Sequence, residues 1–502
     1  MVESFTPKFS TKGGAPAVLV YARYYTTSIV LIRALEQLFK DSPEVPKEIR
    51  FHVVLDDRRD LPMARKALPA SVSIHLQYDA IQPYRDTRKW PEETVSRWEK
   101  SYGSPHLRSF LWMERALEGR PEGVKWRYLL CHLDYFEKLW KEIHPSLYIT
   151  GAADGLLPWT AMTVMKANGV PVLCLGPSRF GKKIFVMDNA YEHLDIGAVY
   201  QRIRREGLLP EQRQQAVQLV EEYRRASVKP VDYIALQGRL KRRRLLPNPF
   251  SAIRLARDAF CTDAGNFDMP LRASLERALK ARRTALYNHL LASTQTAVLP
   301  EAERFFFFPL QYEPEISLST QGRGWHKQLE LVKWISQSLP IDRWLYVKEH
   351  PSMLSGIRPL RFYREILSLP RVRLLKQSIN SFEIVPKAEA VLTITGTAGW
   401  EALMFGRPVV LLGHAFYEEF AEGVTRLESR ETLPAILLDM RRKWFAQEDL
   451  LAYITAVMTK TRDGFFFDPR LYPEMIPDGL GEKNLRNIAA VLREKLPQPV
   501  LS

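Results

Sequence analysis

One stretch of the sequence places two carboxylates directly after an apolar run. Residues 305–317 read Phe-Phe-Phe-Phe-Pro-Leu-Gln-Tyr-Glu-Pro-Glu-Ile-Ser, so the run is followed by Gln311, Glu313, Glu315 and Ser317. Two carboxylates beside an amide and a hydroxyl at a strand end can carry acid–base catalysis or attack an electrophilic carbon. The alternative interpretation is a surface loop with ordinary charged residues.

A histidine and a lysine follow the next apolar run. Residues 343–348 predict a strand that ends in Lys348, and Glu349, His350 and Pro351 come next. An imidazole held at a strand end by a following proline can donate its ring N–H to a phosphate, and Lys348 would add positive charge. A plain strand-to-turn junction is the alternative.

A Thr/Gly-rich turn leads from a predicted strand at 390–394 into a predicted helix at 399–405. It contains Thr395, Gly396, Thr397 and Ala398, and Glu401 follows in the first turns of the helix. Backbone N–H groups and hydroxyls at a helix N-terminus favour anion binding, and Glu401 could accept hydrogen bonds from a ribose diol. A helix cap is the alternative.

Three further places fit the edge of a sheet. Gly413 ends a predicted strand at 408–412, where a glycine lets the backbone approach a ligand. In the first third of the chain, Asp154 follows one predicted strand, and Ser178 and Arg179 follow another. These side chains could contact an acceptor or a donor carboxylate, and a basic loop is the alternative.

Strands alternating with helices position these residues. Short aliphatic runs at 17–21, 51–55, 73–77, 147–150 and 171–175 predict a first parallel α/β unit, and the runs from 305 onward predict a second. We therefore expect an α/β fold with two Rossmann-like doubly wound domains. Their expected bounds are 1–200 for the N-terminal domain, 201–300 for a basic helical connecting region, 301–440 for the C-terminal domain and 441–502 for helices that pack back across the hinge.

Charge and composition point to anionic partners. Lys and Arg number 72 against 57 Asp and Glu, a formal net charge of +15. Residues 239–257, which include the run Lys241-Arg242-Arg243-Arg244, could bind an anionic inner-membrane surface, although a solvated helix face is the simpler alternative. No nucleic-acid-binding module accompanies the charge, so nucleic acid is not expected as a partner.

The sequence also predicts where the protein acts. We recognise no signal peptide and no apolar stretch long enough to span a membrane. The three cysteines are far apart, which is typical of a reducing compartment. We therefore expect a cytoplasmic protein, peripheral at the inner membrane if the basic region binds there.

Together these segments resemble the bacterial capsule polysaccharide biosynthesis family. The resemblance rests on a QxxxExS motif formed by Gln311, Glu315 and Ser317, on His350-Pro351, on the Thr/Gly turn with Glu401-Ala402-Leu403, and on Gly413-x-x-Phe416-Tyr417. That family includes retaining β-Kdo glycosyltransferases, which have a GT-B fold of two Rossmann-like domains facing a cleft and use a CMP-activated sugar. In their QxxxDxS motif, aspartate stands where this chain has Glu315, whose side chain is longer by one methylene.

The resemblance implies a glycosyltransferase whose donor is a nucleotide sugar, with a CMP-linked ulosonic acid as the first choice. Glu315 would be the nucleophile or stabiliser at the anomeric carbon, Glu313 a substitute for it, and His350 the group that holds the leaving phosphate. The second domain would bind the donor and the first a glycan or glycolipid acceptor, without a metal or other cofactor. A UDP-sugar transferase or 2-epimerase of the same fold, or a non-catalytic binding protein of capsule assembly, are the alternatives.

Overall fold

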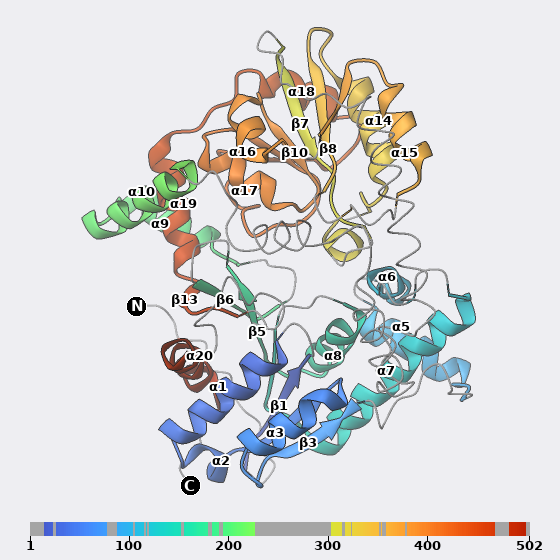
Figure 1. Ribbon diagram of the computed structural model, residues 1–502, viewed down its shortest axis with the longest axis vertical. Coiled ribbons are helices and arrows are strands. Elements are labelled where there is room, and N and C mark those ends of the chain that lie inside the picture. The colour runs from blue at the N-terminus through green and yellow to red at the C-terminus, as the bar shows by residue number, and fades with distance from the viewer. Residues whose placement is uncertain are drawn as a thin grey trace, which may run out of the picture. The chain divides into compact units, whose positions relative to one another are not determined.

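The computed structural model divides the chain into two compact units (Figure 1). It describes residues 15–23, 27–77, 88–103, 106–114, 117, 120–151, 155–178, 183–189, 194–225, 303–313, 317–322, 324–350, 353, 358–376, 379–466 and 481–497. Within this part of the chain, the first unit holds residues 15–189 together with 460–466 and 481–497. The second unit holds residues 194–225 and 303–459.

The first unit is built on a seven-stranded sheet in the order β13-β6-β5-β4-β1-β2-β3. Strand β1 is Ala-Val-Leu-Val-Tyr-Ala and is buried along its whole length, as expected of a parallel strand covered on both faces. Five strands pair in parallel, whereas β6 pairs antiparallel with β5, and β13 pairs antiparallel with β6 at the edge. The strands are β1 (Ala17–Ala22), β2 (Arg50–Leu55), β3 (Ser73–Leu76), β4 (Leu147–Gly151), β5 (Val172–Pro177), β6 (Lys183–Met187) and β13 (Thr461–Asp463).

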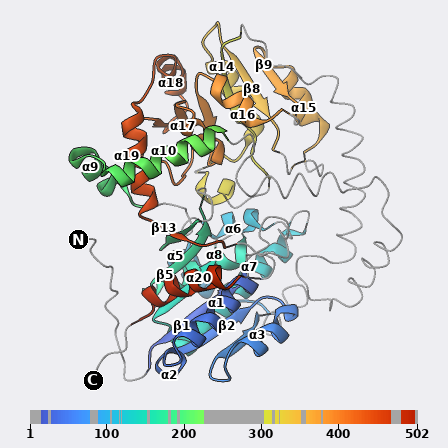
Figure 2. The ribbon, with the colours of Figure 1, turned by 60° about the vertical axis from the view of Figure 1, so that its left-hand side comes forward.

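Helices cover this sheet and tie the C-terminal segment to it. Figure 1 and Figure 2 both show α20 alongside α1, and Ile488 and Leu492 of α20 join the core formed by β1, β2 and α1. The helices are α1 (Ser28–Asp41), α2 (Val45–Glu48), α3 (Leu61–Ala67), α5 (Glu92–Tyr102), α6 (Leu107–Met113), α7 (Glu122–Ile143), α8 (Leu156–Ala167) and α20 (Glu482–Lys495).

The second unit has a six-stranded, wholly parallel sheet in the order β12-β11-β10-β7-β8-β9. The four phenylalanines of β7 are all buried at its centre. The strands are β7 (Phe305–Pro309), β8 (Trp344–Lys348), β9 (Val372–Leu375), β10 (Val391–Thr393), β11 (Val409–Leu411) and β12 (Val424–Arg426). The helices are α9 (Gly197–Glu206), α10 (Pro210–Arg225), α14 (Gln328–Ser338), α15 (Leu360–Leu367), α16 (Ser381–Ile384), α17 (Thr397–Met404), α18 (Leu433–Met440) and α19 (Gln447–Met458).

The two doubly wound sheets confirm the predicted α/β, GT-B-like class, and the cleft between the domains stays a prediction. The bounds of the units differ from the expected domains in two places. Helices α9 and α10 pack on α19 and belong to the second unit, although we expected residues 1–200 in the first domain and 201–300 in a separate connecting region. The segment 441–502 is divided, with α19 in the second unit and α20 in the first.

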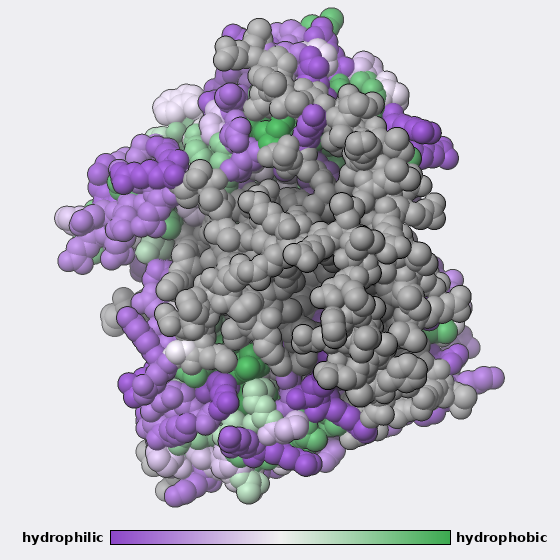
Figure 3. Space-filling model, in the orientation of Figure 1, coloured by the Kyte–Doolittle hydropathy of each residue, from purple (hydrophilic) through white to green (hydrophobic). Residues whose placement is uncertain are grey.

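The described surface carries no broad apolar area in the view of Figure 3. Hydrophilic side chains dominate the described residues there, and the hydrophobic ones form small, separate groups. In the part of the chain that the structure describes, no helix is both long and apolar enough to cross a bilayer. The basic residues 239–257 lie outside the described residues.

Candidate active site at the edge of the second sheet

The strand order of the second sheet reverses between β7 and β10. The chain adds β8 and β9 on one side of β7, and β10, β11 and β12 on the other. In open parallel sheets, ligands bind at such a reversal, outside the carboxyl ends of the strands. That edge receives Gln311 after β7, His350 after β8, Thr395 and Gly396 after β10, and Gly413 after β11. The four sequence motifs therefore meet at one place.

Gln311 spans the reversal and holds the Thr/Gly turn. Its side-chain amide lies 3.0 Å from the Thr395 hydroxyl, and in the orientation that satisfies its partners its oxygen accepts from the Gly396 N–H at 2.6 Å and the Thr395 N–H at 3.2 Å. The N–H groups of Thr395 and Gly396 are thus already hydrogen-bonded within the chain. Helix α17 begins at Thr397 without a side-chain cap, so the N–H groups of Thr397 and Ala398 are the better anion donors of this turn.

Glycines at this edge let one chain segment approach another. A Cβ at Gly413 would lie 2.4 Å from the Gln321 carbonyl oxygen, and one at Gly399 would lie 2.3 Å from the Tyr417 hydroxyl. That hydroxyl donates to the Gly396 carbonyl at 2.6 Å. We expected Gly413 to make room for a ligand, but the space beside it is filled by the backbone of residue 321.

A buried arginine connects the loops that follow β7 and β8. Both Arg358 and Glu349 have side chains only 2% exposed, and Arg358 Nη1 donates to both Glu349 carboxylate oxygens at 2.6 Å. Its Nη2 donates to the Gln311 carbonyl at 2.6 Å, and the Tyr363 hydroxyl donates to Glu349 at 2.7 Å. Burial alone would lower the pKa of Arg358, but the carboxylates of Glu349 and Glu313 outweigh it and raise that pKa.

Glu313 is part of this cluster. Its Oε1 accepts from Gln328 Nε2 at 2.6 Å and its Oε2 from Arg358 Nε at 3.3 Å. Gln328 also donates to the Gln311 carbonyl at 3.0 Å and accepts from the Gln311 N–H at 2.6 Å. Both oxygens of Glu313 therefore fix the loop after β7, which gives this residue a positioning role.

His350 is anchored through its backbone and leaves its ring partly exposed. Its N–H donates to Glu349 at 2.6 Å, and its carbonyl accepts from the Met353 N–H at 2.9 Å. The ring meets that of Tyr312 edge-on, with centroids 6.0 Å apart. The Arg358 cluster thus positions the backbone from which this imidazole projects.

Other predicted site residues differ in how far they reach solvent. Lys348 and Glu401 are each 3% exposed, so neither presents a broad polar surface at the edge. Ser317 begins a π-helical turn that ends at Gln321, and Ser178 follows β5, where its N–H donates to the Lys183 carbonyl at 3.0 Å. Four predicted residues lie outside the described part of the chain, namely Asp154, Arg179, Glu315 and Pro351.

Sequence reasoning missed the buried members of the site. Glu349 lies between Lys348 and His350, but we assigned it no role, and no motif singled out Gln328, Arg358 or Tyr363. The sequence did contain one signal of the buried cluster, a glutamate at the end of an apolar strand. Such a carboxylate needs a partner when it is buried. Nothing in the spacing identified that partner as Arg358.

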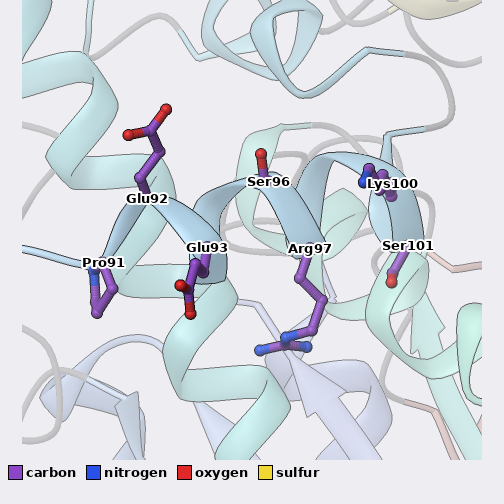
Figure 4. A pocket seen from close by; sticks show the side chains of 7 residues that line it. All are labelled: Pro91, Glu92, Glu93, Ser96, Arg97, Lys100 and Ser101. Carbon is purple, nitrogen blue, oxygen red and sulfur yellow. The ribbon is translucent and has the colours of Figure 1, made fainter.

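A hollow of about 890 Å³ lies elsewhere, against helix α5 of the first unit. Figure 4 shows that its lining comes from one helix, including Glu93, Arg97 and Lys100. The lining therefore comes, among the described residues, from α5 and the residue before it. Among the described residues, no three His, Cys, Asp or Glu side chains gather as a metal site requires, and independence from metals stays a prediction.

Comparison with known proteins shows that part of the chain is similar to one family. Residues 269–443 match the family described as "Capsule polysaccharide biosynthesis protein". Capsule polysaccharide modification protein LipA of Neisseria meningitidis serogroup A is 30% identical over 73 residues, 14% of this chain and 10% of that protein. Protein FixF of Sinorhizobium fredii is 29% identical over 124 residues, 23% of this chain and 28% of FixF. The chain thus spans less than a third of the length of these curated relatives.

Two kinds of enzyme are among the solved structures that match this chain. KpsC of Thermosulfurimonas dismutans, a beta Kdo 2,4 transferase, is 14% identical, with a TM-score of 0.35 over 64% of this chain and 82% of that one. UDP-GlcNAc 2-epimerase of Methanocaldococcus jannaschii is 12% identical, with a TM-score of 0.25 over 88% and 99%. The family match covers every described residue of the sheet-edge site and confirms the resemblance read from the motifs: residues 269–443 of this chain are similar to the capsule polysaccharide biosynthesis family.

Proposed function

We propose that the protein is a glycosyltransferase of bacterial capsule or surface polysaccharide synthesis whose second unit binds a CMP-linked ulosonic acid. The observation that supports this most directly is the meeting of the family's motifs at the strand-order reversal of β7 and β10. The curated relative LipA is named for capsule polysaccharide modification, which agrees with this substrate class. The first unit would bind the glycan or glycolipid acceptor.

In this proposal, the edge of the sheet stabilises the leaving nucleotide. The His350 imidazole and the N–H groups of Thr397 and Ala398 would donate to the phosphate as negative charge develops on it. Donors held in place before the reaction are usually the largest single contribution to catalysis. The Arg358 cluster supplies that rigidity, because it ties the His350 backbone to the loop of Gln311 and Glu313.

The nucleophile follows from the resemblance. The Glu315 carboxylate would attack the anomeric carbon as the bond to the phosphate oxygen breaks, and the acceptor hydroxyl would then displace the carboxylate with loss of its proton. The configuration is retained after two such displacements. Glu315→Gln should therefore abolish transfer while the affinity for the nucleotide stays near that of the wild type, and normal turnover by this variant would contradict the assignment.

A thermal-shift titration tests the proposal without knowledge of the acceptor. CMP, CDP, UDP, GDP and ADP are added separately, first without metal and then with Mg²⁺. A ligand at one hundred times its Kd stabilises by about 2.7 kcal/mol, a shift of roughly 2 °C or more for a large domain. We expect only CMP to give a thermal shift of this size. A response to UDP would favour a UDP-sugar transferase or 2-epimerase, and no response to any nucleotide would favour a non-catalytic binding protein.

We further propose a cytoplasmic protein that binds the inner membrane peripherally through residues 239–257. The support is the charge of this segment, since juxtamembrane Lys and Arg each contribute about 1 kcal/mol at an anionic surface. Co-sedimentation with vesicles containing phosphatidylglycerol should fall when Lys241 to Arg244 are changed to glutamine. Binding unaffected by these changes would remove the basis for the proposal.

A further inference from the structure

A second histidine stands at the same edge, one residue after Gly413. The His414 N–H donates to the Gln321 carbonyl at 2.8 Å, and Gly413 packs so closely that an added Cβ would lie 2.9 Å from the Thr395 methyl group. The His414 side chain is 34% exposed. The imidazole therefore starts beside the turn that leads into α17 and reaches solvent from there.

A buried carboxylate orients this imidazole. His414 Nδ1 lies 2.8 Å from Oε2 of Glu418, whose side chain is 4% exposed. A carboxylate at that distance requires a proton on Nδ1, which fixes the tautomer and turns Nε2 away from the acid. Glu418 is thus a positioning residue, and Nε2 is the ring nitrogen that can meet a ligand.

The charge of Glu418 is already balanced by an arginine. Arg426 Nη1 donates to the same Oε2 at 2.7 Å, and Arg426 Nε lies 3.4 Å from Glu428, whose side chain is 60% exposed. A ligand anion at Nε2 therefore meets a neutralised carboxylate rather than a repelling one. When the imidazole is protonated, His414 and Arg426 balance the carboxylates of Glu418 and Glu428, and Glu428 is the exposed member of this cluster.

The strand order places the two sheet-edge histidines symmetrically. His350 follows β8 and His414 follows β11, and β10 and β7 lie between these two strands. Three strand spacings amount to about 14 Å, so a group over the middle of the β7–β10 reversal is about 7 Å from each outer strand. An extended histidine side chain spans most of that distance. Such a pair suits a compact anion held between two N–H donors.

We propose that His414 binds a phosphate oxygen of the donor nucleotide through Nε2, held in place by Glu418 and Arg426. This inference rests on the proposed function for the identity of the anion. It assigns the loop after β11 a binding role in addition to the tight packing at Gly413. Its substrate class is a phosphate ester. Because Nδ1–H is directed to Glu418, Nε2 donates only from the doubly protonated ring, so the bound histidine is an imidazolium whose two N–H groups meet Glu418 and the phosphate oxygen.

The test compares three variants by calorimetric titration with CMP and, separately, with inorganic pyrophosphate. His414→Gln should weaken CMP binding about tenfold or more, as expected for loss of a charge-assisted hydrogen bond. Glu418→Gln should weaken it less, because the ring remains but is no longer oriented. Glu428→Gln is the matched control, since Glu428 contacts the same arginine from a side chain that is 60% exposed, and it should bind as the wild type does.

Imidazole ¹⁵N NMR separates a binding role from a structural one. In the wild type, Nδ1 of His414 should carry the proton and Nε2 should shift when CMP is added, whereas Glu418→Gln should mix the tautomers. Equal CMP affinity in His414→Gln, or an Nε2 signal that does not respond to CMP, would overturn the inference and leave the proposed function standing. Pyrophosphate binding that depends on His414 in a protein that binds no nucleotide would uphold the anion site and overturn the proposed function. A protein that binds neither probe would overturn both.

Discussion

At the scale of single residues, Arg358 connects the loops after β7 and β8. Its guanidinium bonds Glu349, Glu313 and the Gln311 carbonyl from a position that is 2% exposed. Removing one partner of a buried ion pair leaves the other charge uncompensated, at a cost of about 3–5 kcal/mol. We therefore expect Arg358→Gln to lower the free energy of unfolding by about this amount.

Urea unfolding checks this prediction against a neighbouring arginine. Arg361 pairs with Glu365 one turn along α15, but its side chain is 87% exposed. Exposed pairs of this kind contribute about 0.5 kcal/mol or less, so Arg361→Gln should leave the unfolding midpoint nearly unchanged. Similar losses in the two variants would show that the Arg358 cluster does not stabilise the unit as its geometry implies.

His132 makes the first unit sensitive to acid. It is fully buried on α7, and burial lowers its pKa to about 4, an effect opposed by the Tyr128 carbonyl and reinforced by Arg23. Between pH 6.5 and 4 the unfolded chain takes up a proton that the folded chain does not. Stability present above pH 6.5 is therefore lost as the pH falls through this window, by up to about 3 kcal/mol.

Chemical unfolding measured from pH 4 to 8 tests the slope of this dependence. His132→Gln should flatten it between pH 6.5 and 4, whatever its effect on stability at neutral pH. His106→Gln, at an exposed position of the same unit, is the control and should keep the wild-type slope. An unchanged slope in His132→Gln would contradict the assignment.

At the scale of elements, the sequence predicted the strands that form apolar runs, including the three-residue β10 and β11, and missed β6, β12 and β13. Strands β1, β2, β5, β7 and β8 each contain such a run. By contrast, β13 is Thr-Arg-Asp, and its pairing with β6 depends on residues far away along the chain. The site was predictable to the same extent. Its position could be predicted because strand ends are visible in the sequence, whereas the partner of Glu349 could not, because it depends on how a later loop folds back.

The turn before α17 yields a prediction about a glycine. A methyl group at Gly399 would lie 2.3 Å from the Tyr417 hydroxyl, which must then leave the Gly396 carbonyl. Overpacking of this kind costs about 1–3 kcal/mol, and the lost hydrogen bond adds about 1 kcal/mol. Gly399→Ala should therefore lower the thermal midpoint and weaken CMP binding. Gly123→Ala on α7, where no atom lies within 4 Å, should do neither, and equal behaviour of the two variants would contradict the steric argument.

At the scale of the whole molecule, the C-terminal part of the chain returns to the first unit. β13 pairs with β6, and α20 packs on α1, so the first core contains residues from both ends of the described chain. The second unit has its own core, formed around β7, β8 and β10. A substitution on a helix that contributes to one core should therefore weaken that core.

Leu492 on α20 and Leu437 on α18 make a matched pair for this test. Both side chains are fully buried, one in each core, and truncating a buried leucine to alanine costs about 2–5 kcal/mol. Hydrogen exchange read by mass spectrometry should show faster exchange of α1 and β1 in Leu492→Ala, and of α14 and β7 in Leu437→Ala. CMP should protect the peptides that follow β10 and β11 in Leu492→Ala as in the wild type. If Leu492→Ala accelerated exchange in α14 as much as in α1, the stabilising effect of the described C-terminal segment would not be confined to the first core.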